Sequence, residues 1–238
     1  GSDRSGPLRT TELLDVGAMC FRPGPRLCGG RNFCAAVALD SKRLLLLGGS
    51  NGPSFLDTTE LLDVPSMSFS PGPRMASCRN FCAAALLSPR YLLVLGGSDG
   101  PRPLDTSEIL DIEAMVFTPG PRMSAPRSFC AAARVNPSTV LVLGGFDGPQ
   151  GSSGVLAATD VLDVAAMEFR PGPRLGSPRN FCTVAILDDR RVLVIGGSDG
   201  CSPLSTTEVF PMVGPTCHVL TDSVAALKSG RQREHCTG

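Results

Sequence analysis

Cysteine is the residue type whose spacing first suggests chemistry in this sequence. Four of the 10 cysteines end the same short motif, Arg-x-Phe-Cys, and successive members are 48, 48 and 52 residues apart. They are Cys34, Cys82, Cys130 and Cys182. Four thiolates can hold zinc, but structural zinc sites use close cysteine pairs. The wide spacing therefore favours small-residue packing, and we expect reduced thiols because no secretory signal is visible.

Arginine recurs at two positions, ending each Pro-Gly-Pro-Arg tetrapeptide and opening each Arg-x-Phe-Cys motif. Two interpretations stay open. The arginines bind loop carbonyls and repeat acids such as Glu60 or Asp63, or they form a positive collar that contacts acidic groups of a partner. The second interpretation also includes two residues from loops that differ between units, because such loops often carry binding residues. The candidate partner-binding residues are Arg26, Arg31, Arg74, Arg79, Arg122, Arg127, Arg174, Arg179, Asn51 and Arg102.

Acidic residues follow a threonine or serine in every unit. They are Glu60, Glu108, Asp160 and Glu208. An acid in every unit indicates a structural hydrogen bond, because a catalytic site is expected to break the symmetry. Both histidines, His218 and His235, lie outside the repeats, and no Gly-x-Ser-x-Gly, His-Glu-x-x-His or phosphate-loop motif occurs. We therefore predict no catalytic residue, no metal site and no cofactor.

An internal repeat defines the elements that must position these residues. Each unit contains an apolar run that ends in a glycine pair. These pairs begin at Gly48, Gly96, Gly144 and Gly196. The two arginine motifs and a series of Asp, Met and Phe keep the same register. The third step is longer, and its extra residues fall in the Gly- and Ser-rich stretch 148–154, which predicts an enlarged surface loop.

One unit predicts four short strands. In the second unit they are residues 81–87, 91–96, 106–111 and 115–118. Turn residues separate them, and Pro119-Gly120-Pro121 ends the last. Such a unit is typical of a propeller blade, because a small sheet buries its faces only against neighbouring blades. We therefore predict an all-β propeller of about four to five four-stranded blades.

The unit resembles the kelch repeat over residues 10–210. The resemblance rests on the strand ending in Gly-Gly, the following Asn-Gly or Asp-Gly, Thr-Thr-Glu-Leu-Leu-Asp-Val, and Met-x-Phe-x-Pro-Gly-Pro-Arg. Kelch blades typically carry Tyr in the third strand and Trp in the fourth, where this chain has Leu62 and Phe69. The resemblance implies a kelch-type propeller with divergent repeats. It also implies partners such as ubiquitin-ligase substrates, cytoskeletal proteins or subunits of larger assemblies.

The predicted organisation has three parts: an N-terminal lead (1–9), the repeats (10–210) and a non-repeat tail (211–238) with a short helix. The repeats open on a third and a fourth strand and close on a first, a second and a third. Kelch propellers usually have six or seven blades, so the chain is either a small ring or a fragment of a larger propeller.

We expect an incomplete ring whose exposed edges are covered by further sequence or by a partner. The alternative is a closed ring in which residues 10–23 pair with the sheet of residues 181–195 and residues 206–210 are displaced.

The charge balance bears on the class of partner. Lys+Arg and Asp+Glu both number 22, so the chain has no general attraction to nucleic acid or to a membrane surface. No apolar run reaches the roughly 20 residues of a spanning helix, and the first ten residues lack the apolar core of a signal peptide. We predict a cytoplasmic protein with no nucleic-acid partner and no membrane insertion.

Two function classes fit these patterns. An interaction module needs rigid blades that display variable loops. The alternative is a kelch-type enzyme acting on a small molecule, such as a sugar isomerase or lyase. A copper-radical oxidase would need Tyr and His within the propeller, whereas Tyr91 lies in an apolar strand and both histidines in the tail. We therefore predict a non-catalytic protein–protein interaction module or scaffold subunit of a larger complex, with another protein as partner.

Overall fold

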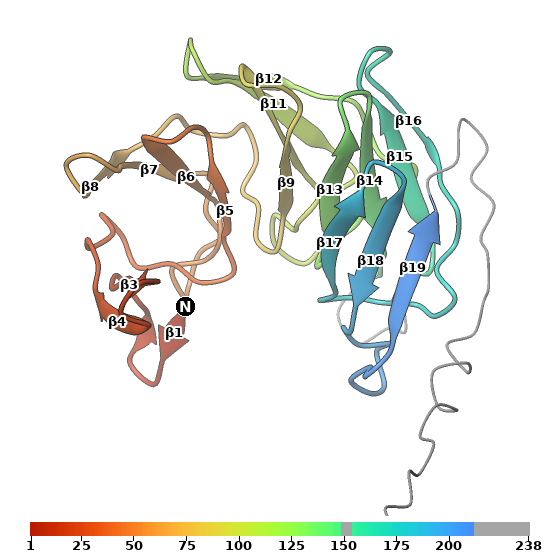
Figure 1. Cartoon of the computed structure of the whole chain (residues 1–238), viewed down its shortest axis with the longest axis horizontal. Coiled ribbons are helices and arrows are strands. Elements are labelled where there is room, and N and C mark those ends of the chain that lie inside the picture. The colour runs from red at the N-terminus through yellow and green to blue at the C-terminus, as the bar shows by residue number, and fades with distance from the viewer. Residues whose placement is uncertain (149–153, 212–238) are drawn as a thin grey trace, which may run out of the picture.

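The structure is a computed structural model that describes residues 1–148 and 154–211. All regular elements in these ranges are β-strands, which form antiparallel sheets arranged as the blades of a propeller (Figure 1). None of the described residues forms a helix long and apolar enough to cross a membrane. The predicted all-β propeller is therefore confirmed.

Three blades have four strands each. The first contains β5 (Ala35–Ala38), β6 (Arg43–Leu47), β7 (Thr59–Asp63) and β8 (Ser68–Pro71). The second contains β9 (Ala83–Leu86), β10 (Tyr91–Leu95), β11 (Ser107–Asp111) and β12 (Val116–Pro119). The third contains β13 (Ala131–Asn136), β14 (Thr139–Leu143), β15 (Thr159–Asp163) and β16 (Glu168–Pro171). The strands predicted for the second unit thus lie in the predicted order, with bounds that differ by at most two residues.

Smaller sheets flank these three blades. The fourth blade has three strands, β17 (Thr183–Asp188), β18 (Arg191–Ile195) and β19 (Thr207–Pro211). At the N-terminal side lie the pair β3 (Glu12–Asp15) and β4 (Cys20–Pro23) and the hairpin β1 (Ser2–Asp3) and β2 (Gly6–Pro7). The hairpin within residues 1–9 was not predicted. Most of the tail and of the enlarged loop, and both histidines, lie outside the described residues.

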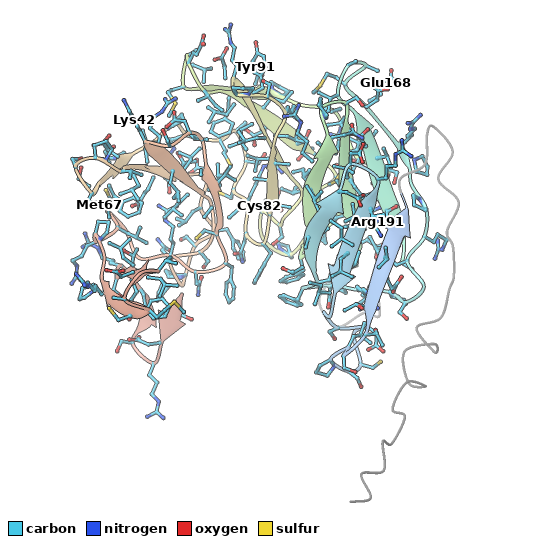
Figure 2. All side chains as sticks on the ribbon, in the orientation of Figure 1. Lys42, Met67, Cys82, Tyr91, Glu168 and Arg191 are labelled. Carbon is cyan, nitrogen blue, oxygen red and sulfur yellow. The ribbon has the colours of Figure 1, made fainter. Side chains whose placement is uncertain are left out.

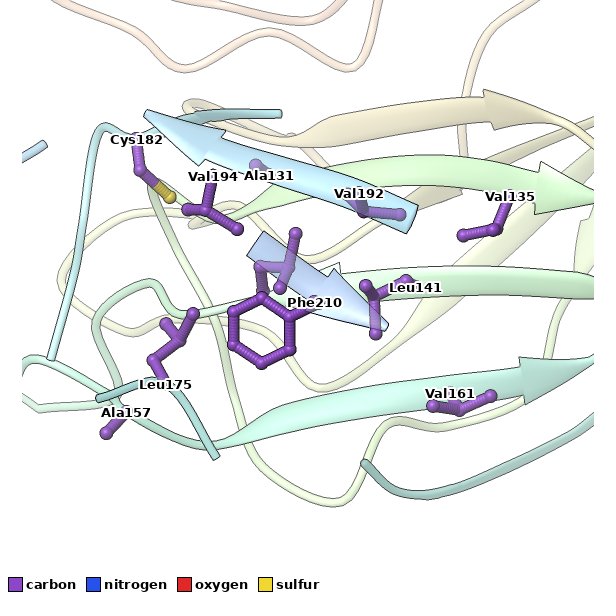
Figure 3. Packing of buried hydrophobic residues seen from close by; sticks show 11 residues of the cluster. Ala131, Val135, Leu141, Ala157, Val161, Leu175, Cys182, Val192, Val194 and Phe210 are labelled. Atoms are coloured by element: carbon purple, nitrogen blue, oxygen red, sulfur yellow. The ribbon is translucent and has the colours of Figure 1, made fainter. Parts of the chain in front are cut away.

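The cores lie between blades, as alternate residues of one strand show. Leu93 and Leu95 of β10 face the third blade, where they join Val140 and Val142. Their neighbours Leu92 and Val94 belong to the core shared with the first blade. A third core joins the last two blades and includes Phe210 of β19 (Figure 3). Because fully burying one such side chain contributes about 1.5–3 kcal/mol, each blade depends on its neighbours for stability.

The glycine pair is where one blade contacts the next. Gly96 and Gly97 end β10 with φ of 61° and 83°, in the left-handed region that favours glycine. The N–H of Gly97 donates to the Arg127 carbonyl of the following blade at 2.8 Å. A Cβ at Gly96 would collide with the same carbonyl oxygen. The glycine pair therefore permits a close backbone approach between neighbouring blades.

The blades follow one another in an open arc (Figure 1). The pair β3–β4 and the blade β17–β19 are separate sheets, and no hydrogen bond between described residues joins them. Residues 207–211 form the third strand of the last blade and are not displaced, so the predicted alternative of a closed ring is not adopted. Leu13, Leu14 and Phe21 of β3–β4 are exposed. That further sequence or a partner covers these edges stays a prediction.

Candidate functional site

A buried ion pair fixes the connector that leads into each blade. In the third blade, Nε of Arg127 donates to Oδ2 of Asp160 at 3.1 Å. Nη2 lies equally close to that oxygen but is not aligned for a hydrogen bond. Nη1 donates to the carbonyls of Gly144 and Ala158 at 2.8 and 2.7 Å. Both side chains of the ion pair are fully buried, so the guanidinium ties the connector to the second and third strands.

The same pair recurs in the other blades, which decides between the two interpretations of these arginines. The pairs are Arg31–Glu60, Arg79–Glu108 and Arg179–Glu208, with N–O distances of 2.7, 3.0 and 2.8 Å. The carboxylates also accept connector N–H groups; Glu60 accepts those of Cys28 and Gly29. The prediction of one collar of eight arginines therefore needs correction. The second arginine of every unit is buried and occupied within its own blade, so it is not available to a partner.

The first arginine of each unit is exposed, but its surroundings differ between blades. Arg74 and Arg122 form ion pairs with Asp57 and Asp105, both at 2.7 Å. In the third blade Ala157 replaces the aspartate, and Arg174 has no carboxylate partner among the described residues. Arg26 likewise has none there. The exposed candidates with free charge are thus Arg26 and Arg174, together with Arg102, while Asn51 is exposed and its side chain accepts the N–H of Ser54.

The phenylalanine that lies two residues after each buried arginine belongs to a single column of stacked rings. The rings of Phe33, Phe81, Phe129 and Phe181 are stacked with neighbouring centroids 4.3, 4.0 and 4.2 Å apart. From the second member onward, the backbone N–H of each phenylalanine donates to the backbone carbonyl of the preceding phenylalanine in the column. All four residues have φ between 52° and 57°, which is rare for a bulky residue. Each of these residues precedes the first strand of its blade, and the column was not predicted from the sequence.

The motif cysteines lie next to this column, and burial makes the thiols of Cys82 and Cys130 poor nucleophiles. Burial raises the pKa of Cys82 to about 11 and that of Cys130 to about 12. Thiolate, the reactive form, is therefore scarce at neutral pH. Figure 2 shows Cys82 on the inner side of its blade, away from Tyr91 at the far end of β10. Among the described residues, no group of three or more His, Cys, Asp or Glu could hold a metal. Cys82, Cys130 and Cys182 belong to or pack against the cores between blades, which supports a role in packing.

A pocket of about 470 Å³ opens beside the phenylalanine column. Its polar lining consists of Asn80, Asn180, Ser98 and Ser128. Its apolar lining includes Phe55, Phe81, Phe129, Phe146, Pro101, Pro103 and Val155, and Gly100, Gly148 and Gly200 complete it. Among the described residues, no charged side chain lines the pocket. The variable loops that follow the glycine pairs form part of its wall, for example through Phe55. Asn51 and Arg102, the two loop residues predicted to bind a partner, do not line it.

The pocket breaks the repeat symmetry at two positions. The motif that reads Arg-Asn-Phe-Cys in three units has Ser128 in place of asparagine in the third. The residue after the glycine pair is serine in three units and Phe146 in the third. These two residues form a β-bridge with each other. Both exceptions are visible when the units are compared position by position in the sequence, but the predictions rested on the residues that repeat.

Neither a scan against protein-family models nor a search of curated proteins finds a match. The propeller arrangement therefore rests on the structure, and the kelch resemblance rests on the motifs alone.

Two asparagines in the pocket wall carry unsatisfied oxygens. Oδ1 of Asn80 and Oδ1 of Asn180 are buried and have no hydrogen-bond partner among the described residues. Their residues are only 3% and 8% exposed. Leaving a buried acceptor unpaired costs about 1–3 kcal/mol. Such groups in a pocket wall indicate a place where a ligand can supply the missing donor.

The pocket and the exposed arginines lie at one end of the blades. In an antiparallel blade, the second and fourth strands end where the first and third begin. The glycine-pair loops, the Pro-Gly-Pro-Arg connectors and the phenylalanine column therefore share this end. We call it the pocket face. It combines a neutral centre with a rim on which Arg74 and Arg122 are neutralised and Arg174 is not.

Proposed function

We propose that this chain is a kelch-type, non-catalytic interaction module, or a scaffold subunit of a larger complex, that binds another protein through its pocket face. Propellers and other repeat folds commonly present concave surfaces to partners. The proposed partner is neither nucleic acid nor a membrane, in keeping with the balanced charge of the chain. The proposed compartment is the cytoplasm, which the eight free cysteines of the described part support.

The observation that carries this proposal is the composition of the pocket wall. General acid–base catalysis needs a titratable group within hydrogen-bond reach of the substrate. The pocket wall instead offers amides, hydroxyls and phenyl rings, which suit recognition. The repeat acids, which an isomerase or lyase could have used, are held in structural ion pairs such as Arg79–Glu108. Binding is therefore favoured over the enzyme alternative.

Substituting Ser98 by phenylalanine is expected to abolish binding at the pocket face without unfolding the chain. Ser98 lines the pocket and is half-buried. Phe146 holds the same register position in the third blade, which shows that a blade tolerates a phenyl ring there. With the immobilised chain as bait, we expect at least one protein captured from a cell lysate to decrease about tenfold or more, which corresponds to about 1.4 kcal/mol.

The matched control is Ser138→Phe. Ser138 is exposed in the turn between β13 and β14, at the opposite end of its blade, so the same change there should leave capture unaltered. Circular dichroism should show both variants folded. Capture that is equal for the wild type and Ser98→Phe would contradict binding at the pocket face.

A further inference from the structure

We propose that the pocket binds an uncharged peptide segment of a partner protein, inserted through one aromatic or branched aliphatic side chain. This inference rests on the proposed function and specifies its ligand. It differs from the collar interpretation, in which acidic groups of a partner would meet arginines. Four features of the pocket lead to it: charge, unpaired amides, phenyl faces and volume.

The charge of the pocket wall argues against an acidic ligand. In the part of the chain that the structure describes, no lysine, arginine or histidine lines the pocket, and the nearby repeat arginine, Arg127, is buried against Asp160. A carboxylate placed there would lose its hydration without gaining a cation, which is strongly unfavourable. The ion pairs of Arg74 and Arg122 further reduce the positive potential of the rim. Among the described residues no aspartate or glutamate lines the pocket either, so a cation would also be buried without a counter-charge. The ligand group that enters the pocket is therefore uncharged.

The two unpaired asparagine amides point to a peptide group. An amide side chain offers one acceptor oxygen and two N–H donors, which match the N–H and C=O of a peptide unit. Asn80 and Asn180 come from the second and fourth blades, so they flank the pocket from different sides. Both oxygens are buried, so the two amides turn toward the pocket when a segment lies across it and donates N–H groups to them. Satisfying these buried acceptors would add to affinity, because each is costly when left unpaired.

The apolar wall selects the side chain that enters. Phe55, Phe81, Phe129 and Phe146 contribute phenyl rings, and two prolines and a valine add aliphatic surface. Four polar side chains are too few for a sugar, whose hydroxyls would each need a partner when buried. A volume of about 470 Å³ lies within the range of about 300–1,000 Å³ that is typical of ligand sites. One anchor side chain with its flanking peptide groups fits this composition.

The test is selection of binders from a displayed library of random 12-residue peptides on the full chain. Peptides retained by Ser98→Phe are subtracted, and the remaining ones are synthesised. We expect them to share an uncharged core with one Phe, Trp, Leu or Ile. Their Kd should change less than about twofold between 50 and 500 mM NaCl, because screening weakens mainly interactions between exposed charges. Selection of acidic peptides whose Kd rises tenfold with salt would overturn the proposed ligand class.

Asparagine variants then test the amide contacts. Asn80→Leu and Asn180→Leu remove an unpaired polar group of similar size, so the Tm should stay the same or rise. Peptide affinity should nevertheless fall about tenfold for each, the effect of one lost hydrogen bond to a buried group. Asn32→Leu is the matched control, because Asn32 has the same motif position and the same unpaired oxygen but does not line the pocket. It should bind normally.

Three results would overturn the proposal. If no peptide is selected, the pocket does not take a peptide. If the leucine variants bind as tightly as the wild type, the amides are not contacts. If both leucine variants lose Tm as well as affinity, the asparagines are structural. A lysate protein that depends on Ser98 in the capture experiment would still support the proposed function in each case, so the two failures can be told apart.

Discussion

Replacing Arg127 by methionine is expected to lower the free energy of unfolding by about 3–5 kcal/mol, the usual effect of breaking a buried ion pair. The substitution leaves the carboxylate of Asp160 buried without its cation. It also removes the donors to the carbonyls of Gly144 and Ala158. Urea denaturation followed by circular dichroism measures the change, provided that unfolding is cooperative.

Two further variants separate the ion pair from general damage. Arg122→Met breaks a different, exposed ion pair with Asp105, in which the arginine side chain is 69% exposed, and should cost less than about 1 kcal/mol. Adding Asp160→Leu to Arg127→Met should recover part of the loss, because it removes the unpaired carboxylate. Equal losses for Arg127→Met and Arg122→Met would show that burial of the repeat arginine does not stabilise the blade.

Replacing Gly96 by valine should lower the Tm by about 6–12 °C, if the change costs about 3 kcal/mol and each kcal/mol shifts the Tm of a chain of this size by about 2–4 °C. The left-handed backbone contributes about 1–2 kcal/mol of this cost for a residue with a Cβ. The rest comes from the collision with the Arg127 carbonyl, which already accepts the N–H of Gly97. The substitution therefore separates two blades.

Gly17→Val is the control for the Gly96 variant. Gly17 lies between β3 and β4, has no positive φ, and a Cβ there would contact only Asp15 at 3.5 Å. Differential scanning calorimetry should show a Tm within about 2 °C of the wild type, because a surface change away from strained positions costs no more than about 0.5 kcal/mol. A Gly96 variant as stable as the Gly17 variant would contradict the interblade role of the glycine pair.

The blades could be predicted from the sequence because local chemistry and the repeat point to the same answer. Apolar strands, turn residues and glycine pairs lie within a few residues of each other along the chain. A single unit could be assigned in more than one way, but four units with the same pattern support one assignment. The partners of the repeat arginines were harder to predict. From the sequence, either Glu60 or Asp63 could have been the partner of Arg31. Only the structure of β7 shows that Glu60 is buried, while Asp63 is exposed at the end of the strand.

The candidate site depended on features that a sequence pattern does not encode. A phenylalanine with positive φ, such as Phe129, is held in that conformation by contacts with neighbouring blades and has no local signature. The unpaired oxygens of Asn80 and Asn180 are likewise visible only when burial and hydrogen bonds are known. Ser128 and Phe146 could have been found, because the sequence alone shows that they depart from the repeat.

The most direct test of binding at the pocket face is site-specific photo-crosslinking to a captured partner. A photoreactive phenylalanine analogue replaces Phe55, which lines the pocket, or Tyr91, which is exposed at the opposite end of the blades (Figure 2). Both changes exchange one aromatic ring for another. We predict a covalent adduct with the partner from position 55 and none from position 91. An adduct from position 91 with none from position 55 would contradict the account.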